Sequence, residues 1–206
     1  MYRLYESINT GSSAVEAALA EAGAVYETIL TSTTDGKHLT DEFRAINPRQ
    51  QIPALILPDG SVMTEGAAMM LHLADAFPEA ALAPKPGTSA RAQHDRWLIF
   101  MAVNIYEGEL RKNYPARYSD DPSGSDAVLS NATTYVNRHY LLLEEALGAG
   151  PYFFGEALTM VDLYLWMLSY WTDPAWLRAN CPGILALVAR VQARPRIEPI
   201  YAKHFT

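Results

Sequence analysis

The sequence predicts a small α/β domain followed by an all-α domain, a helical bundle, and three observations indicate this division. Over residues 1–78, strand and helix patterns follow one another in the order β-α-β-α-β-β-α. Residues 79–88 contain two prolines and one glycine, which is typical of a linker between domains. Long helical patterns dominate residues 89–206. We therefore expect three parts with these boundaries.

The first domain begins with a strand–helix–strand unit. Residues 2–6 alternate and are rich in Tyr and Leu, and Tyr26–Leu30 has the pattern of a second strand. Between the strands, Ser13 and Glu16 fit a capping box at a helix start, and Gly23 is a good helix terminator. A unit of this kind favours parallel strands joined by a right-handed crossover.

In the rest of the first domain, the sequence pattern predicts a short helix, a hairpin and a longer helix. Asn47-Pro48 ends the short helix, because a residue before proline avoids the helical conformation. Pro58-Asp59-Gly60 has the composition of a tight turn. The helix, the two hairpin strands and the second helix are expected over residues 40–45, 54–57, 61–63 and 67–76.

One helix start in the second domain has a complete signature. Thr159 and Asp162 have the spacing of a capping box, and Leu158 and Leu163 occupy the positions of a hydrophobic staple. Helices are expected over residues 90–112, 126–147, 161–170 and 184–192.

Composition narrows the classes of function. The formal net charge of −7 argues against a general affinity for nucleic acid or anionic membranes. The sequence shows no signal-peptide pattern at its start and no apolar run near the ~20 residues of a membrane span. A single cysteine, Cys181, excludes an internal disulfide, and the five histidines show no local metal-ligand spacing. The sequence thus predicts a cytoplasmic protein without a metal.

The most informative segment is Ile52-Pro53-Ala54-Leu55, followed by Glu65 and Gly66 at a predicted helix start. Proline lacks an N–H, so at a strand start it leaves neighbouring backbone groups free to pair elsewhere. With a cis Ile52–Pro53 bond, Ile52 would turn its backbone toward a bound peptide. Glu65 and the free N–H groups of the helix start would hold the charged end of that peptide.

Together these segments resemble the cytosolic glutathione transferases, and the Asn-Pro…Ile-Pro-Ala-Leu and Thr-Glu-Gly segments are most similar to the bacterial beta class. The resemblance spans the whole chain. It is carried by Glu21-Ala22-Gly23, Asn47-Pro48-Arg49-Gln50-Gln51-Ile52-Pro53-Ala54-Leu55, Asp59-Gly60, Thr64-Glu65-Gly66-Ala67-Ala68, Leu73-Ala74-Asp75, Arg96-Trp97-Leu98 and Gly155-Glu156-Ala157-Leu158-Thr159-Met160-Val161-Asp162.

The resemblance implies a thioredoxin-like first domain that binds glutathione, an apolar acceptor pocket between the domains, and a homodimer. It implies that Ile52, beside Pro53, pairs its backbone with the cysteine unit of glutathione. Glu65 would contact the γ-glutamyl ammonium and the Gly66 N–H its carboxylate. It further implies that Gln51 adds a hydrogen bond to glutathione. Lys37 or His38 would contact the carboxylate at the glycine end of the tripeptide, although Lys37 could equally be a solvated surface lysine.

The chemistry that the resemblance implies requires the thiol of glutathione to ionise to a thiolate. Hydroxyl or N–H donors at a helix start can stabilise a thiolate, and the loop from Asn9 to Ser13 lies where such donors are expected. Beta-class relatives carry a cysteine in this loop, where the present sequence has Gly11. Ser12 matches a family hydroxyl and ranks first as the donor, Thr10 ranks second, and Tyr5 on the first strand ranks third. Each also has a structural alternative: a helix cap for Ser12, a loop contact for Thr10 and a core position for Tyr5.

In the second domain, Tyr106 falls where beta-class relatives carry a histidine near the sulfur. A tyrosine there would donate a hydrogen bond to a leaving group or a developing oxyanion. Trp97, Phe100 and Met101 on the same helix would line the acceptor pocket, or would simply belong to the core.

The sequence therefore predicts an enzyme that adds glutathione to a small, electrophilic, partly apolar acceptor. The alternative is a non-catalytic protein on the same scaffold that binds glutathione or another ligand, or regulates a partner. A disulfide reductase is a weaker third hypothesis, because the chain lacks a Cys-x-x-Cys pair.

Overall fold

The chain folds into two compact units, formed by Met1–Thr88 with Val191–Thr206 and by Ser89–Arg190. This computed structural model describes the backbone of residues 1–206 and every side chain except that of Pro122. The sequence assigned residues 191–206 to the helical domain, whereas the structure groups them with the α/β unit. The reason is a set of ion pairs that the sequence separation hides, such as Arg194 with Glu21.

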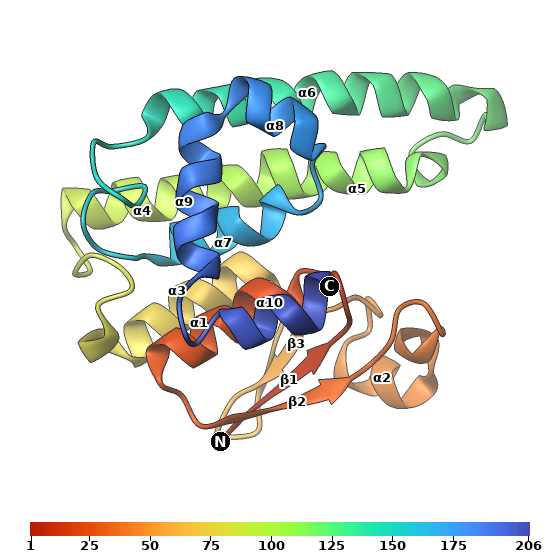
Figure 1. Ribbon diagram of the computed structural model, residues 1–206. Coiled ribbons are helices and arrows are strands. Elements are labelled where there is room, and N and C mark those ends of the chain that lie inside the picture. The colour runs from red at the N-terminus through yellow and green to blue at the C-terminus, as the bar shows by residue number, and fades with distance from the viewer. The chain divides into compact units, whose positions relative to one another are not determined.

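A four-stranded mixed sheet forms the centre of the first unit (Figure 1). Its strand order is β2-β1-β3-β4, with β1 parallel to β2 and antiparallel to β3. This confirms the predicted strand–helix–strand unit and the hairpin. The strands cover Tyr2–Glu6 (β1), Tyr26–Leu30 (β2), Ala54–Ile56 (β3) and Val62–Met63 (β4).

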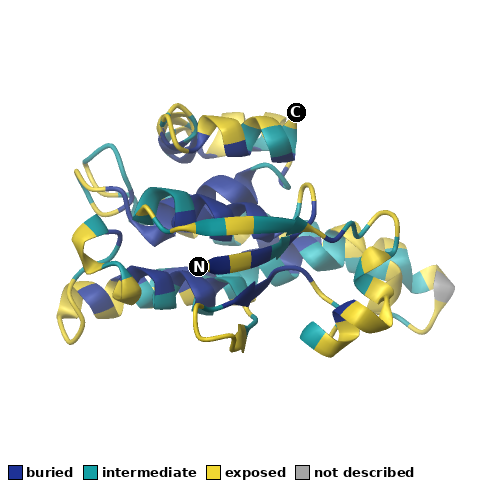
Figure 2. Cartoon of the chain, turned by 90° about the horizontal axis from the view of Figure 1, so that it is seen from below, coloured by how far each residue is buried: buried dark blue, intermediate teal, exposed yellow. Residues whose placement is uncertain are grey.

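Helices cover both faces of this sheet. Residues along β1 alternate in burial, as Figure 2 shows, with Tyr2, Leu4 and Glu6 on one side. Tyr2 contacts Phe77 beyond the end of α3, while Tyr5 faces the other way and contacts Phe43 of α2. The helices are α1 (Ser12–Ala22), α2 (Asp41–Ile46), α3 (Gly66–Ala76) and α10 (Glu198–Phe205), with 3-10 turns at Lys37–Leu39 and Pro78–Ala80.

The capping box predicted for Ser13 and Glu16 is wrong. Helix α1 starts at Ser12, and its cap residue is Gly11, two positions before the predicted cap Ser13. Glycine has no side chain with which to cap a helix. The Ser13 hydroxyl donates to the Thr10 carbonyl at 3.0 Å. The Glu16 carboxylate instead accepts hydrogen bonds from α10, so a contact with a distant part of the chain replaces the local one.

The second unit is helical, as predicted, but its first long helix is interrupted. A π-helical segment, Met101–Tyr106, separates α4 from α5, although no Pro or Gly marks the interruption within those residues. Helix α8 was not predicted. The helices are α4 (Ser89–Phe100), α5 (Glu107–Asn113), α6 (Ser125–Ala146), α7 (Met160–Ser169), α8 (Pro174–Asn180) and α9 (Pro182–Gln192), with 3-10 turns at Pro115–Arg117 and Pro122–Gly124.

The capping box at the start of α7 is confirmed. The Asp162 carboxylate accepts the backbone N–H of Thr159 at 2.7 Å and, through its other oxygen, the N–H of Phe153 at 2.7 Å. Burial raises the pKa of Asp162 to about 6, against the lowering effect of these hydrogen bonds. The buried carboxylate thus joins the loop around Phe153 to the first turn of α7.

Across the part of the chain that the structure describes, no helix has both the length and the apolar character needed to cross a membrane.

Candidate functional site

Four hydroxyl side chains gather where β1 ends and α1 begins. The hydroxyls of Thr10 and Ser12 lie 2.9 Å apart, and each also reaches the Ser7 carbonyl oxygen, at 2.7 Å and 3.1 Å. The Ser7 N–H donates back to the Ser12 hydroxyl at 3.3 Å. Behind them, the Ser7 hydroxyl lies 3.1 Å from that of Thr33. The loop therefore carries two hydroxyl pairs, joined through the backbone of Ser7, which we call the hydroxyl set.

Burial separates the roles of these hydroxyls. Ser12 is fully buried and Ser7 is 3% exposed, whereas Thr10 is only half-buried. Thr10 is thus the member of the pair that a ligand outside the loop can reach. Ser12, ranked first from the sequence, lies behind Thr10 and holds it.

Tyr5 does not belong to this hydroxyl set. Its ring packs against Phe43 with a centroid separation of 5.4 Å, beside the buried Ile52 and Ala54. Because Tyr5 lies on the α2 side of β1, its structural surroundings are those of the core position that was the alternative interpretation.

The Ile52–Pro53 peptide bond is cis, as the sequence interpretation required. Ile52 is 8% exposed. No hydrogen bond within the described part of the chain engages the Ile52 backbone N–H or C=O. Asn47 shapes the preceding turn: its side-chain amide donates to the Gln51 carbonyl at 2.8 Å, and its oxygen accepts the Arg49 N–H at 3.1 Å. The turn thus presents an extended segment with free main-chain groups.

Glu65 holds an unusual backbone conformation at the start of α3, with φ 67° and ψ 100°. A non-glycine residue at positive φ costs free energy, and such residues are concentrated at functional sites. Its carboxylate makes no cap hydrogen bond and is paired instead with the Arg49 guanidinium. The first N–H groups of α3, beginning at Gly66, therefore remain available to an anion.

The remaining predicted glutathione-binding residues, Lys37 and Gln51, lie in two turns on either side of α2. The Gln50 side chain donates to the His38 carbonyl at 3.3 Å, which ties the turn containing Lys37 to the segment before Ile52. The side chains of both Lys37 and Gln51 are exposed. The roles of Lys37 and Gln51 toward glutathione stay a prediction.

Tyr106 lies in the second unit, at the end of the π-helical segment. Its ring contacts Trp171 edge-on, with centroids 5.0 Å apart, and stacks with Tyr164 at 6.3 Å. The ring is half-buried, so part of it is accessible. Met101, on the same segment, is fully buried and belongs to the core.

The single cysteine offers no nucleophile. Cys181 is fully buried, and burial together with the Glu144 carboxylate raises its pKa to about 11. The thiol is therefore neutral at physiological pH, and no second cysteine exists for a disulfide.

Two residues of the site escaped the sequence interpretation. Ser7 organises the hydroxyl set, and Arg49 holds Glu65. A serine directly after a strand is a signal for a loop hydroxyl, so Ser7 was recoverable from the sequence. Arg49 and Glu65 are 16 positions apart on different elements, and no local pattern connects them.

Comparison with known proteins identifies the class. Family models for the glutathione S-transferase N-terminal domain and C-terminal domain match residues 12–76 and 112–204. The chain belongs to the glutathione S-transferase family, with a thioredoxin-like first unit and a helical second unit, and it is an enzyme of that family.

Individual relatives cover nearly the whole chain. An uncharacterized GST-like protein of Escherichia coli K12, YncG, is 30% identical over 99% of this chain and 98% of its own length. Glutathione S-transferase GstA of Escherichia coli O157:H7 is 30% identical over 77% of this chain and 76% of its own.

Solved structures agree with this fold. A glutathione transferase homolog from Sulfitobacter with bound glutathione superimposes with a TM-score of 0.89 at 25% identity, covering 100% of this chain and 99% of its own. The beta-class glutathione S-transferase of Sphingomonas chungbukensis gives a TM-score of 0.81 at 26% identity, with 98% of each chain covered.

Proposed function

We propose that the chain binds glutathione in its first unit and joins it, through its thiolate, to a small, electrophilic, partly apolar acceptor. Ile52 pairs its free backbone groups with the cysteine unit of the tripeptide, next to the cis Pro53. Glu65 receives the γ-glutamyl ammonium, and the Gly66 N–H receives the carboxylate beside it. Lys37 and Gln51, in the turns on either side of α2, contact the glycine end of the tripeptide.

The observation that carries this proposal is the shared acceptor of Thr10 and Ser12. Each hydroxyl has one hydrogen, and both lie within hydrogen-bond distance of the Ser7 carbonyl. When Thr10 turns its hydrogen toward a sulfur, Ser12 still satisfies that carbonyl. The exposed hydroxyl can therefore donate to a ligand without leaving a buried carbonyl unpaired, which would cost free energy.

This arrangement favours the ionised form of the thiol. A hydrogen bond to a charged group contributes about 1.5–3 kcal/mol, which lowers a thiol pKa by roughly one to two units. The starting value is ~8.5, so the bound thiol becomes substantially ionised near neutral pH. The thiol releases its proton to water, and the thiolate attacks an electrophilic carbon with a sulfur electron pair. As the C–S bond forms, either the bond to a leaving group breaks and that group departs with its electron pair, or a π bond of the acceptor opens and its displaced pair is then protonated.

The acceptor side of the reaction belongs to the second unit. We assign Tyr106 the role of donating its phenolic hydrogen to the leaving group or oxyanion that develops as the C–S bond forms. Trp171 and Tyr164 hold the Tyr106 ring and offer an aromatic surface to a partly apolar acceptor.

We also propose a homodimer. On the surface of the second unit, Ile99 and Val103 are 45% and 58% exposed and lie four positions apart, on one face of adjoining helical turns. Analytical ultracentrifugation tests this: a single species of twice the chain mass supports the dimer, and a monomer at micromolar concentration contradicts it.

The test of the function is turnover. The folded protein is assayed with glutathione and a panel of acceptors for substitution, conjugate addition, isomerisation and ether cleavage. We expect glutathione-dependent turnover with at least one acceptor. Binding of glutathione without turnover of any acceptor, and with a fully protonated thiol, would instead favour the non-catalytic carrier.

A further inference from the structure

The C-terminal helix α10 is bonded to both ends of the segment that carries the hydroxyl set. Lys203 Nζ donates to Glu6 Oε2 at 2.7 Å and to Glu16 Oε1 at 2.6 Å. His204 Nε2 lies 2.9 Å from Glu16 Oε2 and 3.4 Å from Glu6 Oε2. We call Glu6, Glu16, Lys203 and His204 the C-terminal clamp.

The clamp is almost completely buried. The side chains of Glu6, Glu16 and His204 are 5%, 7% and 0% exposed, and that of Lys203 is 31% exposed. Two carboxylates so close together need a cation between them, because buried like charges repel strongly. Lys203 supplies that cation, and His204 supplies a hydrogen bond or a second charge.

The two carboxylates of the clamp lie on either side of the Ser7–Ser12 loop in the sequence. Glu6 is the last residue of β1 and directly precedes Ser7, the residue that accepts from Thr10 and Ser12. Glu16 lies on α1, four residues after Ser12. The loop between them is therefore fixed at each end by Lys203, and His204 lies close to both carboxylates. Helix α10 packs beside α1 (Figure 1).

We propose that Lys203 and His204 are positioning residues. Through Glu6 and Glu16 they set the distance between the end of β1 and the start of α1. They thereby hold the Ser7–Ser12 loop in the conformation that presents the Thr10 hydroxyl. This inference rests on the proposed function for its catalytic meaning, whereas the positioning itself is a property of the free protein.

The surrounding charges are consistent with this role. Burial alone would raise the pKa of Glu6, but hydrogen bonds and charge from His204 and Lys203 lower it to about 2. Tyr26 of β2 faces the same carboxylates, and burial together with their charge raises its pKa to about 12, so its hydroxyl stays neutral. The clamp thus keeps Glu6 ionised over the physiological pH range.

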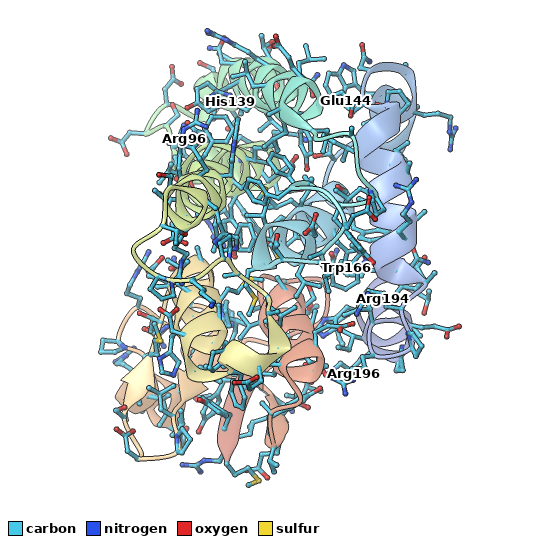
Figure 3. The ribbon with its side chains drawn as sticks, turned by 90° about the vertical axis from the view of Figure 1, so that its left-hand side faces the viewer. Arg96, His139, Glu144, Trp166, Arg194 and Arg196 are labelled. Carbon is cyan, nitrogen blue, oxygen red and sulfur yellow. The ribbon has the colours of Figure 1, made fainter. Side chains whose placement is uncertain are left out.

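The chain offers a matched control in a second ion pair between the C-terminal segment and α1. Arg194, labelled in Figure 3, donates to the Glu21 carboxylate through two nitrogens, at 2.7 Å and 2.8 Å. Its side chain is 34% exposed. This pair lies at the opposite end of α1 from Ser12. An Arg194→Met variant therefore weakens the attachment of the C-terminal segment without touching the loop.

Hydrogen exchange of the free protein measures the positioning directly. We expect Lys203→Met and Lys203→Gln to increase the exchange rate of amides 7–13 at least ~10-fold, since a buried ion pair is broken. His204→Gln gives a smaller increase of the same amides. Arg194→Met leaves amides 7–13 within about twofold of the parent rate. Equal effects of Lys203→Met and Arg194→Met on this segment would overturn the proposal.

Chemical rescue tests whether the positive charge of Lys203 holds the Ser7–Ser12 loop in place. Lys203 and Glu16 line a surface groove with a volume of about 540 Å³, through which a small cation can reach the Glu16 carboxylate. Ethylammonium is expected to restore the slow exchange of amides 7–13 in Lys203→Ala, and sodium at equal ionic strength is not. Equal results with ethylammonium and sodium would contradict the assignment.

The effect of the clamp on catalysis is measured through the ionisation of bound glutathione. With glutathione bound, Lys203→Met should raise the midpoint pH of thiolate formation by about 0.5–1 unit while the KM for glutathione changes less than about twofold, because the hydroxyl and not the binding groups is displaced. Arg194→Met should leave the midpoint unchanged. If the parent protein forms no thiolate, the proposed function fails, and the exchange rates alone decide whether the clamp positions the loop.

Discussion

Thr10 Oγ1 lies 2.9 Å from Ser12 Oγ, and both hydroxyls reach the carbonyl oxygen of Ser7. One of the two is buried and the other is accessible. We propose that this pairing lets an alcohol take the place of the cysteine of beta-class relatives: the inner hydroxyl would keep the Ser7 carbonyl hydrogen-bonded while the outer one donates to the glutathione sulfur.

The first prediction separates the two hydroxyls. Thr10→Val removes the outer donor and should raise the pKa of bound glutathione thiol by at least ~1 unit, and Thr10→Ser should preserve it. Ser12→Ala should give an intermediate shift, because the Ser7 carbonyl then competes for the Thr10 hydrogen. Ultraviolet titration of the bound thiolate measures all three.

Tyr5→Phe is the control for that series. Since Tyr5 packs against Phe43 outside the hydroxyl set, removal of its hydroxyl should leave the thiol pKa unchanged. A shift in Tyr5→Phe as large as that in Thr10→Val would show that the strand tyrosine is the donor after all.

The second prediction concerns glutathione binding. Glu65→Gln removes the charge that we propose receives the γ-glutamyl ammonium, and should raise the KM for glutathione about 10- to 100-fold with a smaller change in kcat. Arg49→Met should weaken binding less, because Arg49 acts through Glu65. Steady-state kinetics with glutathione varied provides the measurement.

Glu42→Gln is the charge-matched control, since Glu42 is an exposed acid in the first turn of α2. Its KM for glutathione should stay within about twofold of the parent value, as expected of a surface charge. A comparable rise in Glu42→Gln and Glu65→Gln would indicate a general charge effect and contradict the assignment of Glu65.

The third prediction is the pH dependence of the first unit's stability. The folded pKa of Glu6 is lowered to about 2 from an ordinary value of 4.5, so its contribution is present above pH 4.5 and is lost as pH falls toward 2. Burial would lower the pKa of His204, but its hydrogen bonds to Glu16 and Glu6 raise it above 6.5. Its contribution is present below pH 6.5 and is lost as pH rises through the raised value.

The clamp should therefore stabilise the first unit most between pH 4.5 and 6.5. All four tryptophans lie in the second unit, so hydrogen exchange of β1 and α1 is the appropriate probe. His204→Gln should abolish the alkaline part of the pH dependence and keep the acidic part. An unchanged alkaline limb in His204→Gln would assign that limb to another group.

The fourth prediction concerns the capping box of the second unit. Asp162→Asn retains one acceptor oxygen for the N–H groups of Phe153 and Thr159, and should lower the free energy of unfolding by about 1–3 kcal/mol at pH 7. Tryptophan fluorescence during denaturant unfolding follows it, because Trp166 lies on α7. The exposed Asp120→Asn variant should change stability by less than about 0.5 kcal/mol.

Local patterns in the sequence predicted most elements of both units. The strand pattern of Tyr26–Leu30 and the box formed by Thr159 and Asp162 each depend on residues within a few positions, and both are confirmed. The Ile52–Pro53 segment was interpretable because proline restricts its neighbours in a specific way.

The failures share a cause in long-range contacts. Glu16 has the right spacing from Ser13 for a capping box, but Lys203, 187 positions later, takes its carboxylate. The ranking of Ser12 above Thr10 depends on chain position and stays a prediction. The burial of Ser12, which is a property of the whole fold, is the reason that we propose Thr10 as the outer donor.

The most direct test of the central claim is the ionisation of glutathione bound to the parent protein. Ultraviolet difference titration should give a thiol pKa at least one unit below the ~8.5 of a free thiol, and Thr10→Val should return it toward that value. Saturating glutathione whose thiol titrates as it does in free solution would contradict the account.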